Sequence, residues 1–291
     1  MKCLTGLLAV GALLLCAPGL DGQQQIDRRL ALSPDPYIRV TVMSGSVRVI
    51  GWDRDSIAVT GSIEGEAEFI FGGGADGAKL AVWPEYDGTA DPAYLEIHVP
   101  SRSTVWIKTE DADIEVVEVA SIDAYSVTGR IEVLGEVRQL YAESMGGDLE
   151  ISASGPSIRA KSAGGSIAYR GMAVELDLST VSGDISVIAP PVDRGRFESL
   201  NGAIWFEGGV GRGGSLDFHT HDGMIELRLA EAISADFEIT SVEGKIRNDF
   251  HSGGLDERTG RRGRELSFVN GSGGARVTVQ TFRGTVVLRR Q

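Results

Sequence analysis

Apolar and polar positions alternate over short stretches of this chain, in a unit that reads Ser/Thr-x-x-Gly-x-Ile-x-Val. Apolar side chains lie two and four residues after the glycine. A second alternating set lies three, five and seven residues before it, as in Ser126, Ala124 and Ile122. Because successive side chains of a strand point to opposite faces, both sets predict short strands with one buried face. No helical spacing of three to four residues occurs after the N-terminal segment.

The unit recurs along most of the chain. A first copy at Thr109 has Ala112 at the glycine position, and further copies begin at Ser126, Ser144, Ser162, Thr180, Ser199, Thr220, Ser241 and Thr281. From Ala112 to Gly244, successive positions are 17, 18, 18, 18, 19, 21 and 21 residues apart. This period predicts an all-β fold, a parallel β-solenoid (β-helix) of about eight to ten coils with a period of about 18–21, preceded by a β-strand cap. We expect each glycine to mark a corner that needs a positive φ.

Stacked coils place equivalent side chains in columns, and the charges along these columns test the register. Six residues before the glycine, the outward column reads Asp123, Tyr141, Arg159, Asp177, Arg196 and Asp217. Its last four members alternate in sign. Directly stacked like charges would be unfavourable, so the alternation supports this alignment of the copies.

The expected boundaries follow from where the repeat is regular. Residues 1–22 are predicted to be a signal peptide and residues 23–35 an N-terminal linker. Residues 36–291 then form a single β-solenoid domain. Within it we assign 36–108 to a β cap and first strands, 109–250 to regular coils, and 251–291 to an insertion and C-terminal cap. From His251 onward eight arginines face three acidic residues, which makes this last segment basic.

The N-terminus has the pattern of a secretory signal peptide. Lys2 precedes a nearly continuous apolar run from Leu4 to Cys16, which is too short to span a membrane comfortably. Cleavage after Gly22 is expected, with Gly19 as the alternative. Lipid attachment at Cys16 is a further alternative, although Leu15 stands where that reaction requires a small residue. The two cysteines both lie in this segment, so a cleaved chain would have neither disulfides nor thiolate ligands.

The chain has 291 residues, 42% hydrophobic residues and 24% charged residues, which is typical of a folded protein. Its net charge of −13 argues against nucleic acid and against generic binding to anionic membranes. No cofactor is indicated by any motif. We expect an exported protein of the periplasm, cell envelope or extracellular space, without a transmembrane segment in the mature chain.

The motif SGSVRVIGW, the run of Ser-x-x-Gly-x-Ile-x-Val copies and the ending SVEGKIRNDF to TFRGTVVL resemble the bacterial putative-adhesin family. The resemblance covers about residues 37–288. It implies an exported or envelope-associated β-solenoid of unknown function. The family supplies no established catalytic motif, so no residue role is carried over from it.

Four residues are candidates for a binding face: Glu115, Glu132, Glu150 and Trp205. The three glutamates share one column, with only Arg130 close to them, and could bind a cation or a basic partner. A solvated face is the alternative. Trp205 belongs to the same column and could contact a sugar or a protein, or could pack under a neighbouring loop.

His219 and His221, with Asp217 and Asp222, are a weaker candidate for a metal-binding site. In the repeat His219 is an outward strand position and His221 a corner position, so their side chains should diverge. We therefore predict no metal site and no catalytic residue.

The preferred interpretation is a non-catalytic envelope or surface protein, an adhesin-like binding or scaffold module that acts through extended β-faces. An envelope glycan or a surface protein could be the partner, and self-association remains an option. The alternative is a carbohydrate-active β-helix enzyme, a lyase or hydrolase, using acids on the face of Glu115, Glu132 and Glu150.

Overall fold

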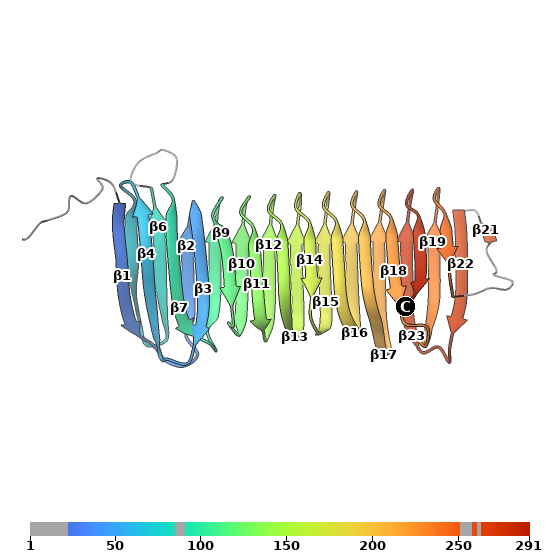
Figure 1. Ribbon diagram of the computed structural model, residues 1–291, viewed down its shortest axis with the longest axis horizontal. Coiled ribbons are helices and arrows are strands. Elements are labelled where there is room, and N and C mark those ends of the chain that lie inside the picture. The colour runs from blue at the N-terminus through green and yellow to red at the C-terminus, as the bar shows by residue number, and fades with distance from the viewer. Residues whose placement is uncertain (1–22, 85–90, 251–257, 261–262) are drawn as a thin grey trace, which may run out of the picture.

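The computed structural model describes residues 23–84, 91–250, 258–260 and 263–291. In this part of the chain 24 strands pair into one continuous sheet assembly, and no helix is present. The all-β prediction is therefore confirmed. The predicted signal peptide and most of the polar insertion after Phe250 lie outside the described residues. Figure 1 shows an elongated molecule whose strands run across its long axis.

The strands form two ladders on two sides of the molecule, which we call side A and side B. In spatial order, side A contains β5 (Glu68–Gly74), β6 (Gly77–Trp83), β2 (Tyr37–Val42), β8 (Thr104–Thr109), β10 (Ser121–Ser126), β12 (Gln139–Ser144), β15 (Ala173–Thr180), β23 (Ala275–Thr281), β19 (Ala235–Ser241), β22 (Gly263–Asn270) and β21 (Arg258–Gly260). Side B contains β1 (Gln23–Ala31), β4 (Ser56–Glu64), β7 (Ala93–Pro100), β3 (Gly45–Trp52), β9 (Asp113–Val117), β11 (Ile131–Glu136), β14 (Ile167–Arg170), β18 (Ile225–Leu229), β24 (Val286–Arg290) and β20 (Ile246–Asn248). Three long strands contribute to both sides: β13 (Leu149–Ser162), β16 (Ile185–Ser199) and β17 (Ile204–Thr220).

The central strands pair in parallel with the equivalent strands of the neighbouring coil, in the register that the repeat predicts. Ile122 is opposite Leu140, Leu140 is opposite Ile158, and Ile158 is opposite Leu176. All four side chains are buried. The inward positions of the two sides therefore meet in one core that extends along the stack, and apolar burial on this scale stabilises a chain whose described part contains no cysteine.

The predicted charge column is also present. Asp123, Tyr141, Arg159, Asp177, Arg196 and Asp217 are successive partners in the ladder of side A. The Arg159 guanidinium donates to Asp177 at 3.1 Å. This pair is exposed and contributes little stability, but it shows that the register was assigned correctly.

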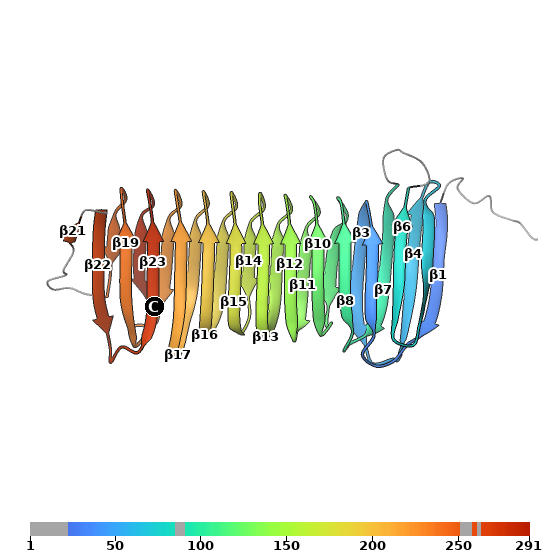
Figure 2. The ribbon, with the colours of Figure 1, turned by 180° about the vertical axis from the view of Figure 1, so that it is seen from behind.

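Near each end, one coil is out of sequence order. β2 and β3 lie between the coil of β6 and β7 and the coil of β8 and β9. At the other end, β23 and β24 lie between the coil of β17 and β18 and the coil of β19 and β20. Figure 1 and Figure 2 show this as blue strands among green ones and red strands among orange ones. We call these two coils the inserted coils.

Each inserted coil places an arginine between two carboxylates. Arg48 of β3 lies between Glu96 and Glu115 in the ladder and pairs with Glu115 at 3.2 Å. Arg283, at the corner after β23, pairs with Asp222 at 3.7 Å and with Glu243 at 3.5 Å. If the coils were stacked in sequence order, Glu96 would lie next to Glu115 and Asp222 next to Glu243. Like charges would then be direct neighbours at both places, which is unfavourable.

Two expected boundaries need correction. Gln23–Ala31, in the predicted linker, forms β1, which pairs antiparallel with β4 over nine residues because its backbone groups complete the edge of side B. The second correction concerns Ala275–Arg290, which we expected to close the fold as part of a C-terminal cap. These residues form the second inserted coil instead, and β19, β20 and β22 lie beyond it.

Candidate functional site

In the regular coils, the turn between a strand of side A and the next strand of side B is built on the Ser/Thr-x-x-Gly segment, and we call it the tight corner. In the coil of Thr180, the hydroxyl accepts a hydrogen bond from the Gly183 amide at 3.1 Å. The same hydroxyl donates to the Gly165 carbonyl of the preceding coil at 3.1 Å. Ser162, Ser199, Thr220 and Ser241 make the same two bonds with their own corner and a neighbouring one. The hydroxyl ladder is therefore structural, because each of these five buried oxygens donates one hydrogen bond and accepts another within the stacked corners.

The corner glycines are required for a reason that the sequence analysis missed. Gly129, Gly147, Gly165, Gly183 and Gly202 are not among the glycines with positive φ, so the expectation of a left-handed corner was wrong. A Cβ on Gly183 would lie 2.0 Å from the carbonyl oxygen of Gly165. The coils stack too closely at this point for any side chain, and that close approach selects glycine.

A groove follows the tight corners along the long axis. It has a volume of about 970 Å³ and is lined by seven coils, from Ser144 to Ser241 in the ladder. One wall consists of the residues just after the hydroxyl ladder: Met145, Ala163, Val181, Leu200, His221, Phe282 and Val242. The other wall consists of the residues just before it: Glu143, Lys161, Ser179, Glu198, His219, Gln280 and Thr240. We call this feature the corner groove, and these the apolar wall and the polar wall.

The apolar wall is unusually exposed for its composition. Met145 is 64% exposed, Leu200 49% and Val181 46%. His221 stacks on Phe282 with ring centroids 4.9 Å apart, which continues the wall across the inserted coil. Contiguous exposed apolar surface of this kind marks sites of contact with other molecules.

The polar wall has two carboxylates, Glu143 and Glu198, and both accept a hydrogen bond. The Tyr141 hydroxyl donates to Glu143, and burial together with this bond raises the pKa of Tyr141 to about 12. The Arg196 Nε donates to Glu198 at 2.8 Å. Lys161 makes no hydrogen bond or ion pair within the described part of the chain. The polar wall therefore carries one unpaired lysine, Lys161, between Glu143, which is bonded to a neutral hydroxyl, and Glu198, which is paired with an arginine.

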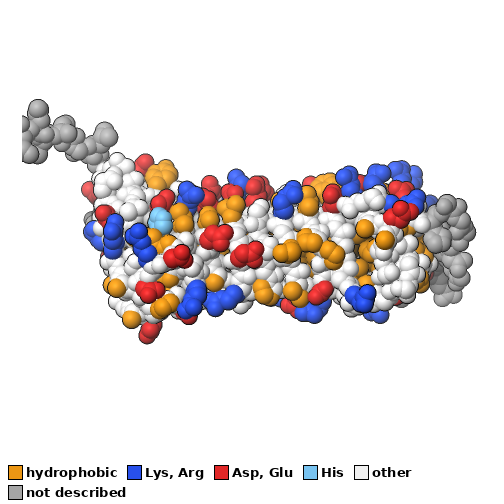
Figure 3. All heavy atoms as spheres, turned by 60° about the horizontal axis from the view of Figure 1, so that its bottom comes forward, with side chains coloured by type: hydrophobic (Ala, Val, Ile, Leu, Met, Phe, Trp, Pro, Cys, Tyr) orange, Lys and Arg blue, Asp and Glu red, His pale blue; other side chains and the backbone are white. Residues whose placement is uncertain are grey.

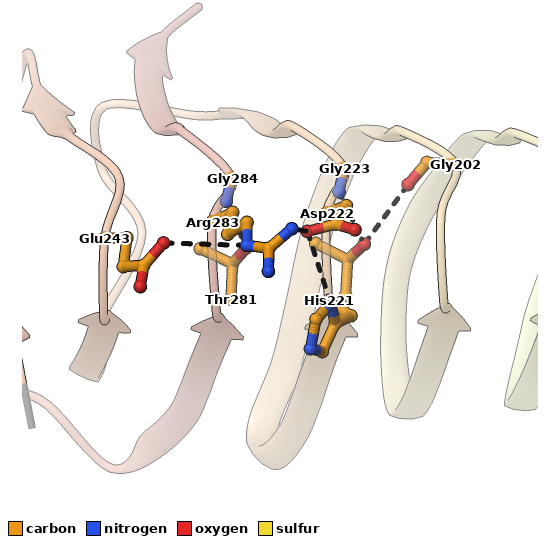
Figure 4. A network of polar contacts seen from close by, with 9 residues as sticks. Gly202, His221, Asp222, Gly223, Glu243, Thr281, Arg283 and Gly284 are labelled. Atoms are coloured by element: carbon orange, nitrogen blue, oxygen red, sulfur yellow. Dashed lines mark hydrogen bonds and ion pairs between the residues drawn. The ribbon is translucent and has the colours of Figure 1, made fainter.

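Figure 4 shows the polar network at the C-terminal part of the groove. His221 Nδ1 lies 3.2 Å from the Asp222 carboxylate, and Arg283 bridges Asp222 and Glu243. His219 and His221 line opposite walls of the groove, in line with the expected divergence. Within the described residues, no group of three His, Cys, Asp or Glu side chains is arranged to hold a metal ion.

The structure places the predicted acidic residues in one column of side B. Glu115 is opposite Glu132, and Glu132 is opposite Glu150. Arg130 contacts both Glu132, at 3.4 Å, and Glu150. Arg48 pairs with Glu115 and was missed as a neighbour because it belongs to the inserted coil. Each of the three glutamates therefore has an arginine partner.

Trp205 is in the same column as these glutamates, three coils beyond Glu150. It lies between Ser186 and Glu226 and is 37% exposed. Glu226 is nearly buried and accepts hydrogen bonds from Arg228 at 3.0 Å and from Arg289 at 2.9 Å. Burial alone would raise the pKa of Glu226, but these two guanidinium groups lower it below the ordinary value.

Figure 3 shows acidic, basic and apolar side chains mixed along one face of the molecule.

Residues 23–84, 91–250, 258–260 and 263–291 include no helix long and apolar enough to cross a bilayer.

The parallel stack of repeated coils is the architecture of β-solenoid proteins. The chain belongs to the Toastrack DUF4097 family, whose model matches residues 37–289. The family resemblance seen in the sequence is thereby confirmed.

Solved structures similar to this chain have low sequence identity to it. One, described as a putative lipid binding protein from Parabacteroides distasonis, is 11% identical, with a TM-score of 0.56 over 92% of this chain and 98% of that chain. Another, described as a putative adhesin from Parabacteroides merdae, is 13% identical, with a TM-score of 0.48 over 93% of this chain and 97% of that chain. No curated protein sequence matches this chain. At these identities the likeness concerns the fold alone.

The corner groove itself was not predicted, although the sequence contains its signal. The residue directly after the ladder hydroxyl is apolar in most copies, for example in Met145, Val181, Leu200 and Val242. This position interrupts the strict alternation of the strands and lies at the start of the turn. Apolar residues at a repeated turn position are the pattern by which the groove could have been found.

Proposed function

We propose that this protein is an exported, non-catalytic, adhesin-like binding or scaffold module that holds an extended partner along its length. In this proposal the chain is a β-solenoid of about eight to ten coils with a period of about 18–21. The observation that carries the proposal is the corner groove, because seven coils each contribute one residue to either wall. A surface built from equivalent positions suits a partner that is itself long and regular.

The pairing of the acidic column favours this proposal over the carbohydrate-active enzyme. A glycosidase needs two carboxylates that differ in protonation and face one substrate bond. Glu115 is paired with Arg48, while Glu132 and Glu150 share Arg130. Each of the three carboxylates is therefore already engaged by an arginine, and none of them lines the corner groove.

The four predicted site residues remain a second contact face within the same proposal. Trp205 offers exposed aromatic surface beside Ser186, and the glutamate column offers paired charges on the same side. An envelope glycan or a surface protein is the class of partner that fits such a face. Export and placement in the envelope belong to the proposal as well.

A sedimentation assay tests the proposal. Purified chain 23–291 is mixed with isolated bacterial envelope fractions, with matched samples stripped of glycan, of protein or of lipid. We expect the chain to sediment with at least one fraction. The substitution Leu200→Glu in the groove should reduce the amount of protein that co-sediments more than Val174→Glu does. Val174 is a suitable control, because it is also exposed, at 43%, and does not line the groove. Absence of sedimentation with every fraction would contradict the proposal.

A further inference from the structure

We infer that the corner groove binds one long acyl chain carrying a single anionic headgroup. This inference rests on the proposed function, because it names the ligand class of the same surface. The groove extends over six inter-coil steps from Met145 to Val242, about 29 Å at about 4.8 Å for each step. It is therefore long, and it lies between the two side-chain columns that form its walls.

The bottom of the groove offers few hydrogen-bonding groups to a ligand. At Thr180 the hydroxyl is bonded to both Gly183 and Gly165, and the same arrangement holds at Ser199 and Thr220. Corner amides such as those of Ser182 and Asn201 donate to carbonyl groups of the preceding coil. A peptide in the groove would therefore leave its own backbone groups without partners against the apolar wall.

An acyl chain has no such requirement. It needs only apolar contact, which Met145, Val181, Leu200, Phe282 and Val242 offer in one row along the groove. The exposed fractions of Met145, 64%, and Leu200, 49%, show how much apolar surface remains to be covered. A bilayer surface fits less well, because these side chains form the side of a concave groove instead of a projecting patch.

The charges of the groove give the ligand a direction. Lys161, beside Ala163, has no hydrogen bond or ion pair within the described residues. Glu198 is paired with Arg196, and Glu143, opposite Lys161 in the ladder, accepts a hydrogen bond from Tyr141 and makes none with Lys161. At the far end, beyond Val242, Glu265 of β22 lines the groove. An anionic headgroup is therefore favoured at Lys161 and disfavoured at Glu265.

From Ala163 to Val242 the apolar wall covers five inter-coil steps, about 24 Å. A long acyl chain could extend along this distance with its headgroup at Lys161. The ligand that this geometry points to is a monomeric fatty-acid-like amphiphile, taken up one molecule at a time.

The test is a binding titration of chain 23–291 with sodium hexadecanoate below its micellar concentration. We expect one molecule bound per chain, with affinity falling up to about fourfold for each methylene removed in a series down to decanoate. Leu200→Glu and Val181→Glu should each abolish binding, and Val174→Glu should not. Lys161→Met should weaken hexadecanoate binding while leaving hexadecanol binding unchanged.

Three outcomes would overturn the inference. These are affinity independent of chain length, equal binding by Leu200→Glu and the parent chain, and binding only to vesicles of anionic phospholipid. Circular dichroism of each variant separates loss of the site from loss of the fold.

The sedimentation assay keeps this inference distinct from the proposed function. If Leu200→Glu abolishes sedimentation but hexadecanoate does not bind the parent chain, the groove is a contact surface and its ligand class is wrong. If hexadecanoate binds as expected but the chain does not co-sediment with any envelope fraction, the ligand class is supported and the adhesin-like function is contradicted.

Discussion

At the tight corners, two adjacent glycines of one turn have different structural roles. A Cβ on Gly165 would lie 2.1 Å from the carbonyl oxygen of Gly147 in the neighbouring coil. A Cβ on Gly164 would have only ordinary contact, at 3.4 Å from the Met145 carbonyl oxygen. Close stacking of the coils therefore requires glycine at position 165 but not at position 164.

We predict that Gly165→Ala lowers the free energy of unfolding by at least about 2 kcal/mol, because the clash is with backbone that cannot move independently. Gly164→Ala should change it by less than about 1 kcal/mol, and in the stabilising direction, because alanine restricts the unfolded chain. Urea unfolding followed by circular dichroism measures both. Equal effects of the two substitutions would show that coil stacking does not select the corner glycine.

A second prediction at this scale concerns Glu226. Because the pKa of Glu226 is lowered in the folded protein, its ionised form is stabilised by folding. This stabilisation is present above the ordinary glutamate pKa of about 4.3 and is lost as the pH falls through the lower folded value. Glu226→Gln should cost about 1–3 kcal/mol at pH 7, and the difference from the parent chain should shrink below about pH 4.3.

Urea unfolding at a series of pH values checks this prediction. Glu207→Gln is the matched control, because Glu207 lies 4.0 Å from the same Arg228 but is exposed, at 45% of its side chain. It should cost little at any pH. A Glu226→Gln penalty that persists unchanged at acid pH would contradict the assignment.

At this scale the sequence predicted which residues face inward, because alternation of period two directly reports burial. The inward positions Ile122, Leu140 and Ile158 are all buried. It could not predict the neighbours of an outward residue where the coil order departs from the sequence order. Arg48 is 67 residues before Glu115 and nevertheless contacts it.

At the scale of elements, the two inserted coils are the feature that sequence reasoning missed. The repeat predicts which residues of two coils are equivalent, but it contains no information about which coil lies next to which. The charges did contain a hint, because Asp222 and Glu243 would have been direct neighbours in sequence order. Arg283 of the inserted coil lies between these two carboxylates and forms an ion pair with each of them.

We predict that Arg283→Glu destabilises the C-terminal coils, because it places three carboxylates in one column. Amide hydrogen exchange of β23 and β19 should become faster, while exchange in β10 and β12 should not change. Arg212→Glu is the control for net charge, since Arg212 is exposed and has no ion pair within the described chain. Adding Asp222→Arg and Glu243→Arg to the Arg283→Glu variant should restore slow exchange. Failure of this rescue would mean that charge does not hold the inserted coil.

At the scale of the whole molecule, the period near 18 was sufficient to predict a stacked parallel fold, because each coil buries its apolar face only against its own opposite side and its neighbours. The ends of the stack were harder to predict. A terminal coil has a neighbour on one side only, so its sequence departs from the repeat, and β1, β4 and β5 therefore pair antiparallel there. The corner groove belongs to this scale as well, since it exists only when the coils are stacked.

The open ends lead to a last prediction about assembly. β1 pairs with β4 over nine residues and covers the edge of side B. In residues 23–291 the outermost strand is β1, whose charged residues Asp27, Arg28 and Arg29 oppose the addition of a further strand. Without β1, the outermost strand would be β4, which carries one charged residue, Glu64, and to which a second chain could add a strand. Residues 33–291 should therefore self-associate with increasing concentration, while residues 23–291 should stay monomeric, as measured by light scattering after size-exclusion chromatography.

A charge on the exposed edge separates strand addition from general unfolding. Thr60 faces Asp27 of β1 in the ladder, so Thr60→Lys in residues 33–291 places a lysine on the uncovered edge. Lysine at an edge opposes strand pairing, and this variant should be less associated than its parent. If residues 33–291 remain monomeric at every concentration, or if Thr60→Lys has no effect on their association, β1 does not act by protecting this edge.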